Sequence, residues 1–157
     1  MMYRAALLCT LCTLASLAVV AIAERARASE LVVVIRGVDS AEGELQIEVY
    51  GEPQRATFPY ADRGVLAEVR IQARTLQPPG KQASVSFGDL APGSYAVSVI
   101  HDANGNGDID LNMLGMPTEG YGFSNDAHGT LGPPSFDAAA VRVGPTDPTR
   151  IEITLRH

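Results

Sequence analysis

The stretch Glu44-Leu-Gln-Ile-Glu-Val-Tyr50 decides the fold class, because polar and apolar residues alternate along it without interruption. Leu45, Ile47 and Val49 take every second position, and polar side chains take the positions between them. Successive side chains of a β-strand point to opposite faces, so an apolar period of two predicts a strand with one buried face. Alternation this regular is typical of antiparallel sheets that cover a core on one side only.

Six further segments carry strand patterns, and turns rich in glycine and proline separate them. Residues 31–35 form a continuous apolar run, which predicts a strand buried on both faces. Residues 65–73 alternate with period two, although a short helix over 61–74 is a competing interpretation. Further strands are predicted at residues 84–87, 95–100, 139–143 and 150–156. Seven short strands without a long helical pattern predict an all-β fold, a seven-stranded Greek-key β-sandwich.

Residues 1–28 have the layout of a secretory signal peptide. Arg4 precedes an apolar run over residues 5–23, and two sites of the form Ala-x-Ala compete for cleavage. Cleavage at the second site, after Ala28, would leave residues 29–157 as a single domain in an extracytoplasmic compartment, periplasmic or secreted. The alternative is an uncleaved membrane anchor, because the run is almost long enough to span a bilayer.

The expected mature chain carries neither cysteine nor excess positive charge. Cys9 and Cys12 both lie inside the signal-like run, so residues 29–157 can form no disulfide. Of the 12 basic and 18 acidic residues in the whole chain, three and one lie before residue 29, which leaves a net charge of −8 for the mature chain. Such a charge disfavours nucleic acid and anionic membrane surfaces. We therefore expect no nucleic-acid binding and no membrane insertion after cleavage.

One long segment departs from the strand pattern. Between Lys81 and Arg142 the chain has seven acidic residues and no lysine or arginine. Residues 102–136 within it show no apolar periodicity and contain seven glycines and three prolines. Segments of this length in a compact domain are mostly functional or disordered, and the apolar residues argue against disorder. We therefore predict one long ordered loop between the fifth and sixth strands. The residues predicted to fasten it to the sandwich are Met113, Leu114, Met116, Tyr121, Phe123, Leu131 and Phe136.

The loop opens with Asp102-Ala-Asn-Gly-Asn-Gly-Asp-Ile-Asp110, in which oxygen-bearing side chains recur at every second position. Calcium takes roughly six to eight oxygen ligands, and a glycine at the sixth position of such a loop allows a sharp turn. Met113 stands where an EF-hand has its glutamate, so an EF-hand is excluded, and Asn112 or Glu119 would complete the site. The predicted calcium ligands are Asp102, Asn104, Asn106, Asp108, Asp110 and Glu119. The alternative is a metal-free turn.

The second half of the loop offers side chains suited to a binding partner. Tyr121 and Phe123 stand between glycines, and aromatic rings on a rigid loop suit contacts with a sugar or a peptide. The alternative is that both rings anchor the loop to the sandwich. The predicted ligand-binding residues are His101, Tyr121, Phe123, Ser124 and Asn125. The expected partner is an extracytoplasmic protein or a carbohydrate.

Two other chemistries are compatible with these residue types. A hydrolase would use His101 with Asp102 or Glu119, although nothing in the spacing enforces this pairing. Ser124 lacks the strand-to-helix turn that exposes a nucleophile in common hydrolases. A softer metal such as copper would use His101 and His128 with the nearby methionines. His101 also shares the parity of core residues in its strand, so a packed histidine at the base of the loop is the simpler interpretation.

Four segments together resemble a bacterial family of small exported proteins that is classed only as a domain of unknown function. The segments are His101–Asp110, Leu114–Pro117, Glu119–Asn125 and Gly132–Phe136. This resemblance covers nearly all of the expected mature chain. It implies export and brings no assigned activity, so the interpretation from the residues stands: a non-catalytic calcium-binding module that binds a ligand or belongs to the envelope.

The segment Phe87-Gly-Asp-Leu-Ala-Pro-Gly-Ser-Tyr95 is similar to the strand-turn-strand signature of transthyretin-like and collagen-adhesin B-type sandwiches. This resemblance implies that Phe87, Leu90 and Tyr95 are core residues of a transthyretin-like (prealbumin-like) sandwich. The transthyretin-like enzyme that hydrolyses hydroxyisourate ends in tyrosine-arginine-glycine-serine, whereas this chain ends Thr154-Leu-Arg-His157. That enzymatic activity is therefore not implied.

Overall fold

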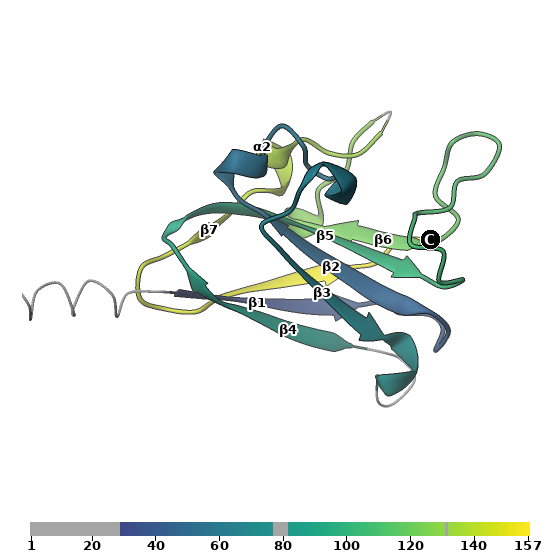
Figure 1. Ribbon diagram of the computed structural model, residues 1–157, viewed down its shortest axis with the longest axis horizontal. Coiled ribbons are helices and arrows are strands. Elements are labelled where there is room, and N and C mark those ends of the chain that lie inside the picture. The colour runs from purple at the N-terminus through teal and green to yellow at the C-terminus, as the bar shows by residue number, and fades with distance from the viewer. Residues whose placement is uncertain (1–28, 77–81, 131) are drawn as a thin grey trace, which may run out of the picture.

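The computed structural model describes residues 29–76, 82–130 and 132–157, and it shows two β-sheets packed face to face (Figure 1). The all-β sandwich prediction is confirmed. The predicted signal peptide and the predicted anchor Leu131 lie outside the described residues. None of the helices in the described ranges is long and apolar enough to cross a membrane.

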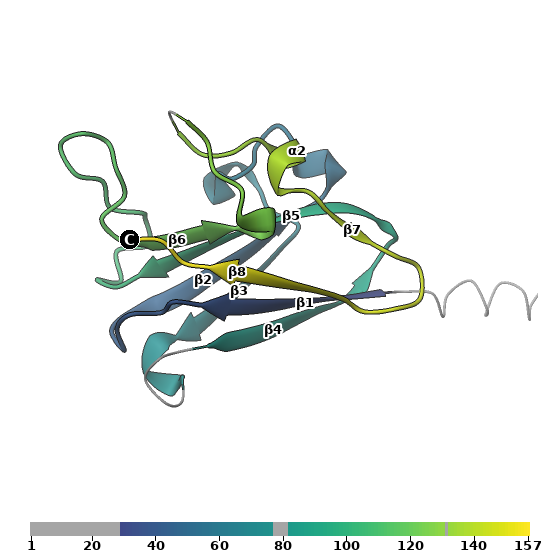
Figure 2. The same cartoon turned by 180° about the vertical axis from the view of Figure 1, so that it is seen from behind.

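The smaller sheet has three strands in the order β4-β1-β8. Its strands are β4 (Ala83–Leu90), β1 (Ser29–Arg36) and β8 (Thr149–Thr154). The central strand β1 pairs antiparallel with β4 and parallel with β8, so the first and last strands of the domain lie side by side (Figure 2). A central strand covered by a second sheet suits a continuous apolar run, and Leu31, Val33 and Ile35 are completely buried.

The larger sheet has five strands built around β2 and β5. Its strands are β3 (Ala67–Gln72), β2 (Glu44–Tyr50), β5 (Gly93–Asp102), β6 (Gly120–Phe123) and β7 (Val141–Val143). β2 and β3 pair antiparallel, and so do β2 and β5. β6 pairs with the second half of β5, whereas β7 pairs with its first three residues.

Five short helices complete the described elements: η1 (Glu52–Gln54), η2 (Ala61–Arg63), η3 (Ala73–Thr75), η4 (Ser124–Asp126) and α2 (Phe136–Ala139). The strand predicted over 65–73 is shorter at both ends than expected, since η2 precedes it and η3 begins at Ala73. α2 replaces the start of the strand predicted over 139–143. The Ser135 hydroxyl caps this helix by accepting a hydrogen bond from the Ala138 amide, at 3.2 Å.

The sheet contains a strand that the sequence pattern did not predict. β6 lies inside the segment predicted to be one long ordered loop, which gives eight strands instead of seven in the described residues. Its sequence Gly120-Tyr-Gly-Phe123 alternates glycines with aromatic residues, so it has no apolar periodicity. Glycine is required because a Cβ on Gly122 would lie 2.7 Å from Cγ2 of Ile153. The two sheets approach closely here, so this strand carries glycines and lacks the alternating apolar pattern by which a strand is predicted.

The chain beyond β8 joins the two sheets along one side of the sandwich. The Tyr121 amide donates to the Arg156 carbonyl at 3.0 Å, and the Arg156 amide donates back to the Tyr121 carbonyl at 2.8 Å. The C-terminal residues consequently lie beside β6 and close to the base of the long loop (Figure 1).

The main core lies between the two sheets and contains the residues that alternation placed inward. Leu45, Ile47 and Val49 of β2 are completely buried. Phe87, Leu90 and Tyr95 also belong to this core, as the second resemblance implies. The other buried members are Leu31, Val33, Ile35, Val38, Ala83, Val85, Val97, Val99, Val143, Ile153 and Leu155.

The outer face of the larger sheet is also covered, which contradicts the prediction that residues 44–50 are buried on one face only. A second apolar cluster formed with Phe58 and Phe136 covers Tyr50 at one end of β2. Gln46 and Glu48 are each only 3% exposed, although they alternate with the core residues. Alternation shows which side chains share a face, but it does not show whether another part of the chain covers that face.

Candidate functional site

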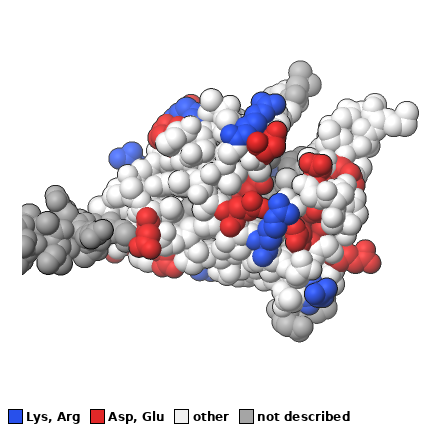
Figure 3. Space-filling view, in the orientation of Figure 1, with Lys and Arg blue, Asp and Glu red and all other residues white. Residues whose placement is uncertain are grey.

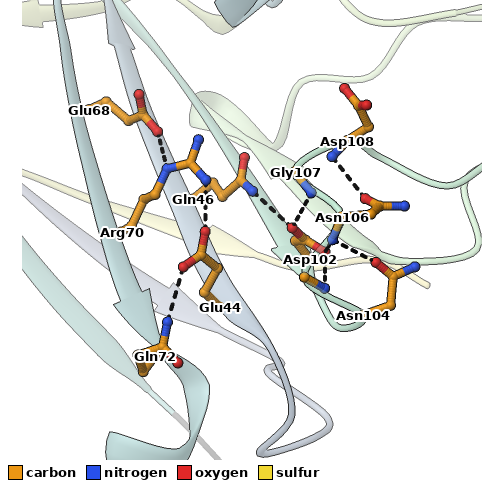
Figure 4. A network of polar contacts seen from close by, with 11 residues as sticks. Glu44, Gln46, Glu68, Arg70, Gln72, Asp102, Asn104, Asn106, Gly107 and Asp108 are labelled. Atoms are coloured by element: carbon orange, nitrogen blue, oxygen red, sulfur yellow. Dashed lines mark hydrogen bonds and ion pairs between the residues drawn. The ribbon is translucent and has the colours of Figure 1, made fainter.

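The candidate site begins at Asp102, the last residue of β5, whose side chain lies on the outer face of the larger sheet (Figure 4). Asp102 is 1% exposed, so its carboxylate needs local partners. The side-chain amide of Gln46 on the neighbouring strand donates to Asp102 Oδ2 at 3.1 Å. β2 and β5 therefore fix the position of the first predicted ligand.

The chain after Asp102 turns tightly around its carboxylate. The amides of Gly105 and Asn106 donate to Oδ1 at 2.7 and 3.2 Å, and the amide of Gly107 donates to Oδ2 at 2.8 Å. Gly105 and Gly107 have φ angles of +76° and +88°, in the left-handed region that favours glycine. The glycine at the sixth position thus permits the turn for the reason that the sequence suggested.

The next side chains of the repeat converge on Asp110. The Asn104 amide nitrogen donates to Asp110 Oδ2 at 2.5 Å, and the Asn106 amide nitrogen donates to Oδ1 at 3.0 Å. The amide oxygens of the same two residues accept main-chain hydrogen bonds from Asn106 and Asp108, both at 2.9 Å. The structure therefore brings Asp102, Asn104, Asn106 and Asp110 into one compact loop.

The other two predicted ligands differ from each other in position. Asp108 is exposed, and its carboxylate points away from Asp102 (Figure 4). Glu119 is 7% exposed and closes the base of the loop, because its two carboxylate oxygens accept the amides of Ala103 and Asp110 at 2.9 and 3.1 Å. Glu119 therefore belongs to the loop, 17 positions after its first residue.

The chemistry of these donors fits a hard cation such as calcium, with one condition. Carboxylate and amide oxygens are the ligands that calcium prefers. Asn104 and Asn106, however, present amide nitrogens to Asp110, so ion binding requires both amides to turn their oxygens inward. In the described residues no group of three or more histidine, cysteine or acidic side chains gathers closely enough to hold a metal. The two asparagines are therefore essential members of the candidate set.

A cavity of about 330 Å³ separates the start of the loop from strands β2 and β3. Arg70 spans its sheet side, where its guanidinium bonds to Glu44 at 2.8 Å and to Glu68 at 2.5 Å (Figure 4). The Gln72 amide donates to Glu44 at 3.0 Å. On the loop side the cavity is lined by Asp102, Gly105, Asn106 and Gly107. Arg70 of β3 therefore faces the start of the loop across this cavity.

A buried polar cluster that the sequence pattern did not predict lies on the outer face of β2 and β5. Glu48 Oε2 accepts the Tyr50 hydroxyl at 2.6 Å and the Ser98 hydroxyl at 2.9 Å. Burial raises the pKa of Glu48 above its usual 4.5, and the two hydroxyl donors partly offset this rise. Burial and the neighbouring Glu48 also raise the pKa of Tyr50. The only sequence signal was a tyrosine on the polar side of the alternating stretch.

The predicted ligand-binding residues of the second half of the loop occupy different environments. Tyr121 and Phe123 are half-buried, and their rings lie 6.1 Å apart in an edge-on arrangement. Ser124 is completely buried, where its hydroxyl accepts the Val97 amide at 2.9 Å and donates to the Ala139 carbonyl at 2.5 Å. Asn125 is exposed, and its side chain donates to the Ala140 carbonyl at 2.7 Å. Ser124 and Asn125 thus fasten β6 to its neighbours.

His101 faces away from the loop carboxylates. It is 1% exposed, its Nε2 donates to the Glu42 carbonyl at 2.9 Å, and its Nδ1 lies 3.4 Å from an Asp39 carboxylate oxygen. Asp102 follows it in β5, so the two side chains point to opposite faces of the sheet. This arrangement does not place His101 and Asp102 on a common reacting group. The copper alternative gains no support either, since His128 is exposed and lies 3.4 Å from the Asp126 carbonyl.

The predicted apolar anchors at the middle of the loop are wrong. Met113, Leu114 and Met116 are all exposed, as is the neighbouring Leu111, and they lie in a segment that projects from the body of the molecule (Figure 1). Phe123 and Phe136, in contrast, do pack against the sandwich around Phe58. Glu119 and the turn around Asp102 hold the base of the loop through hydrogen bonds, so its middle needs no apolar anchor.

Comparison with known proteins places the chain in a family. A family model described as "Uncharacterized protein conserved in bacteria (DUF2141)" matches residues 33–152. The chain belongs to this family. The DUF2141 match extends from β1 into β8 and includes the whole loop, so the candidate site lies within the region that defines the family.

Structural comparison adds little to the DUF2141 assignment. The chain is similar to a fimbrial assembly protein from Parabacteroides distasonis, with 7% sequence identity and a TM-score of 0.43. The similarity covers 82% of this chain and 52% of the other, so the chain spans about half the length of that protein. No curated protein matches the chain in sequence.

Proposed function

We propose that this protein is an exported, non-catalytic binding module of the bacterial envelope, and that calcium organises its long loop. The convergence of Asp102, Asn104, Asn106 and Asp110 in one tight turn carries this proposal. Their spacing suits calcium, and the hydrogen bonds to the sheet and to Glu119 hold the turn in place without any ion. A preformed loop of this kind reduces the entropy cost of binding.

The local charge supports a cation more than a metal-free turn. Asp102, Asp108, Asp110 and Glu119 give this loop four carboxylates, and the sequence from residue 82 to 141 has no lysine or arginine. Arg70 lies across the cavity and already bonds to Glu44 and Glu68. Like charges repel each other, and a divalent cation in the turn would offset the negative charges of Asp102 and Asp110.

The binding role rests on the surface beside the loop. Tyr121 and Phe123 present half-buried rings on the outer face of the larger sheet, next to the exposed part of the loop. Rings of this kind suit a carbohydrate or an extended peptide. The buried positions of Phe87, Leu90 and Tyr95 support a transthyretin-like arrangement of the sandwich. The side chains of His101 and Asp102 point to opposite faces of the sheet, which does not favour a hydrolase that pairs them. We therefore propose no catalytic activity.

Thermal unfolding of residues 29–157 in calcium and in chelator tests the metal. An ion that binds the folded state alone stabilises it by about 2.7 kcal/mol at a concentration 100 times its Kd. We expect a concentration-dependent rise in Tm for the native sequence and none for Asp110→Asn. The matched control is Asp147→Asn, which removes one exposed negative charge away from the loop and keeps the rise.

Two results would contradict the proposal. An unchanged Tm up to about 10 mM calcium would exclude a site even in the weak extracellular range. An equal rise for Asp110→Asn and for Asp147→Asn would show that any ion binds elsewhere. Export is tested separately, by fusing residues 1–28 to a reporter that is active only outside the cytoplasm. A reporter that stays inactive would remove the envelope location from the proposal.

A further inference from the structure

The middle of the long loop presents four large apolar side chains to solvent. Leu114 is 87% exposed, Met113 is fully exposed, and Leu111 and Met116 are each 57% exposed. Residues 111–118 contain no charged side chain, and we call this segment the tip. Figure 3 shows the tip as an uncharged projection with acidic side chains at its base. Elsewhere in the described residues only Tyr60 and Leu66 are large apolar side chains with comparable exposure.

Hydrogen bonds within the tip hold it in a defined turn. The Asn112 side-chain oxygen accepts the amides of Leu114 and Met116 at 2.9 and 3.1 Å. The Asn112 amide donates to the Met116 carbonyl at 2.8 Å, and the Gly115 amide donates to the Asn112 carbonyl at 2.9 Å. A bridge between Leu111 and Pro117 closes the base of the turn. The apolar side chains are therefore presented by a preorganised structure.

We propose that the tip inserts into the interfacial region of a lipid bilayer, which departs from the expectation, based on net charge, that the mature chain inserts into no membrane. Most main-chain donors of the tip are satisfied within it, because the amides of Asn112, Leu114, Gly115 and Met116 all bond internally and Pro117 has no amide hydrogen. Internal satisfaction is what an apolar phase without hydrogen-bonding partners demands. Leu and Met side chains on a convex projection gain free energy from burial in that phase.

The charge around the tip selects the kind of lipid surface. Asp108 and Asp110 precede the tip and Glu119 follows it, so an anionic membrane repels the stem that carries the tip. Zwitterionic lipids, such as phosphatidylcholine, impose no such cost. Pairing of two tips from separate copies would bring the same carboxylates together, which disfavours self-association through this surface. The lipid surface that best suits the tip is therefore a bilayer without net charge.

The test uses residues 29–157, whose described parts form one sandwich, with sucrose-loaded vesicles and sedimentation in chelator. We expect binding to phosphatidylcholine vesicles and weaker binding when a quarter of the lipid is phosphatidylglycerol. Leu114→Ser should lower the partition coefficient roughly tenfold, because an inserted leucine gains about 1.5 kcal/mol or more. Leu66→Ser is the matched control, since Leu66 is 45% exposed at a distant site, and it should leave partitioning unchanged.

Fluorescence provides a second readout that does not depend on sedimentation. The chain has no tryptophan, so Leu114→Trp and Leu66→Trp each introduce one reporter. We expect phosphatidylcholine vesicles to shift the emission of the first variant to shorter wavelength and to leave the second unchanged. Urea unfolding of both variants checks that the fold is intact.

Three results would overturn the inference. The first is the absence of binding to vesicles of either composition, and the second is equal partitioning of Leu114→Ser and the native sequence. The third is self-association that Leu114→Ser abolishes without any vesicle effect, which would make the tip a protein contact. The same experiment in calcium distinguishes this inference from the proposed function. Calcium bound in the loop would offset the negative charge near the tip and should therefore raise binding to the anionic vesicles. Binding to phosphatidylcholine with no calcium response would support the tip proposal and contradict the calcium site alone.

Discussion

Replacement of Tyr50 by phenylalanine tests the polar cluster on the outer face of the larger sheet. The Tyr50 hydroxyl is buried and donates to Glu48 at 2.6 Å, and Ser98 supplies the other donor at 2.9 Å. A hydrogen bond to a charged group contributes about 1.5–3 kcal/mol, against about 1 kcal/mol for a neutral pair. Tyr50→Phe should therefore lower the free energy of unfolding by about 2 kcal/mol when Glu48 is ionised.

The loss should depend on pH in a defined direction. Burial raises the folded-state pKa of Glu48 above 4.5, so the folded protein keeps a proton that the unfolded chain has released. Stability consequently falls as the pH rises from about 4.5 through the folded-state pKa. The Tyr50 hydrogen bond lowers that pKa, and its removal raises the pKa further. The deficit of the variant should be small near pH 4.5 and should grow above it.

Urea unfolding between pH 4.5 and 8.5 measures this difference, and Tyr95→Phe is the control. The Tyr95 hydroxyl donates to the Ala91 carbonyl at 2.6 Å, a neutral acceptor, so its loss should cost about 1 kcal/mol at every pH. Comparison of the two variants cancels the titration of all other groups. A deficit for Tyr50→Phe that is as independent of pH as that of Tyr95→Phe would refute an ionised Glu48 in this cluster.

Three further substitutions test the supports of the loop, each by urea unfolding at pH 7. Gly43→Ala should cost more than about 3 kcal/mol, because Gly43 has a φ of +66° and its Cβ would lie 1.9 Å from the Asp102 carbonyl; a cost below about 1 kcal/mol would contradict this close approach. Asp102→Asn should lower the free energy of unfolding by about 3 kcal/mol, because an oxygen that accepts hydrogen bonds from two amide groups is replaced by an NH₂ donor. An unchanged urea midpoint would disprove the role of that carboxylate. Ser124→Ala should cost about 3 kcal/mol by leaving a buried amide and a buried carbonyl unpaired, whereas Ser124→Thr with the same loss would point to packing alone.

The sandwich was predictable because its core follows period two. Leu45, Ile47 and Val49 point inward in β2, and Tyr95 and Val97 do so in β5, as the alternation required. The parallel pairing of the first and last strands was not predictable, since it depends on contacts between residues more than 100 positions apart. β6 was missed because the close approach of His157 to Gly120 and of Ile153 to Gly122 favours glycine at every second position, which removes the apolar signal.

The convergence of the loop side chains was predictable, whereas their surroundings were not. The spacing of Asp102, Asn104 and Asn106 did indicate a common turn, in which the Asn106 amide donates to the side-chain oxygens of Asp102 and Asn104. Burial of Glu48 followed from elements that cover the polar face of β2, and alternation carries no information about them. The exposure of Leu114 was not predicted because apolar residues are buried on average. Hydrogen bonds within the turn hold this segment in place, so it does not need to bury Leu114.

The two ends of the described chain differ in how they relate to the loop. Ser29 starts β1 at one end of the sandwich, whereas the segment after β8 runs along β6 to the base of the loop at the other end (Figures 1 and 2). An affinity tag or fluorescent fusion joined after His157 would therefore crowd the loop and mask it from vesicles or ions. A handle joined before Ser29 would hold the molecule by its opposite end and leave the loop free to point outward. The 10-residue strand β5 connects the two ends, and its length corresponds to roughly 30 Å.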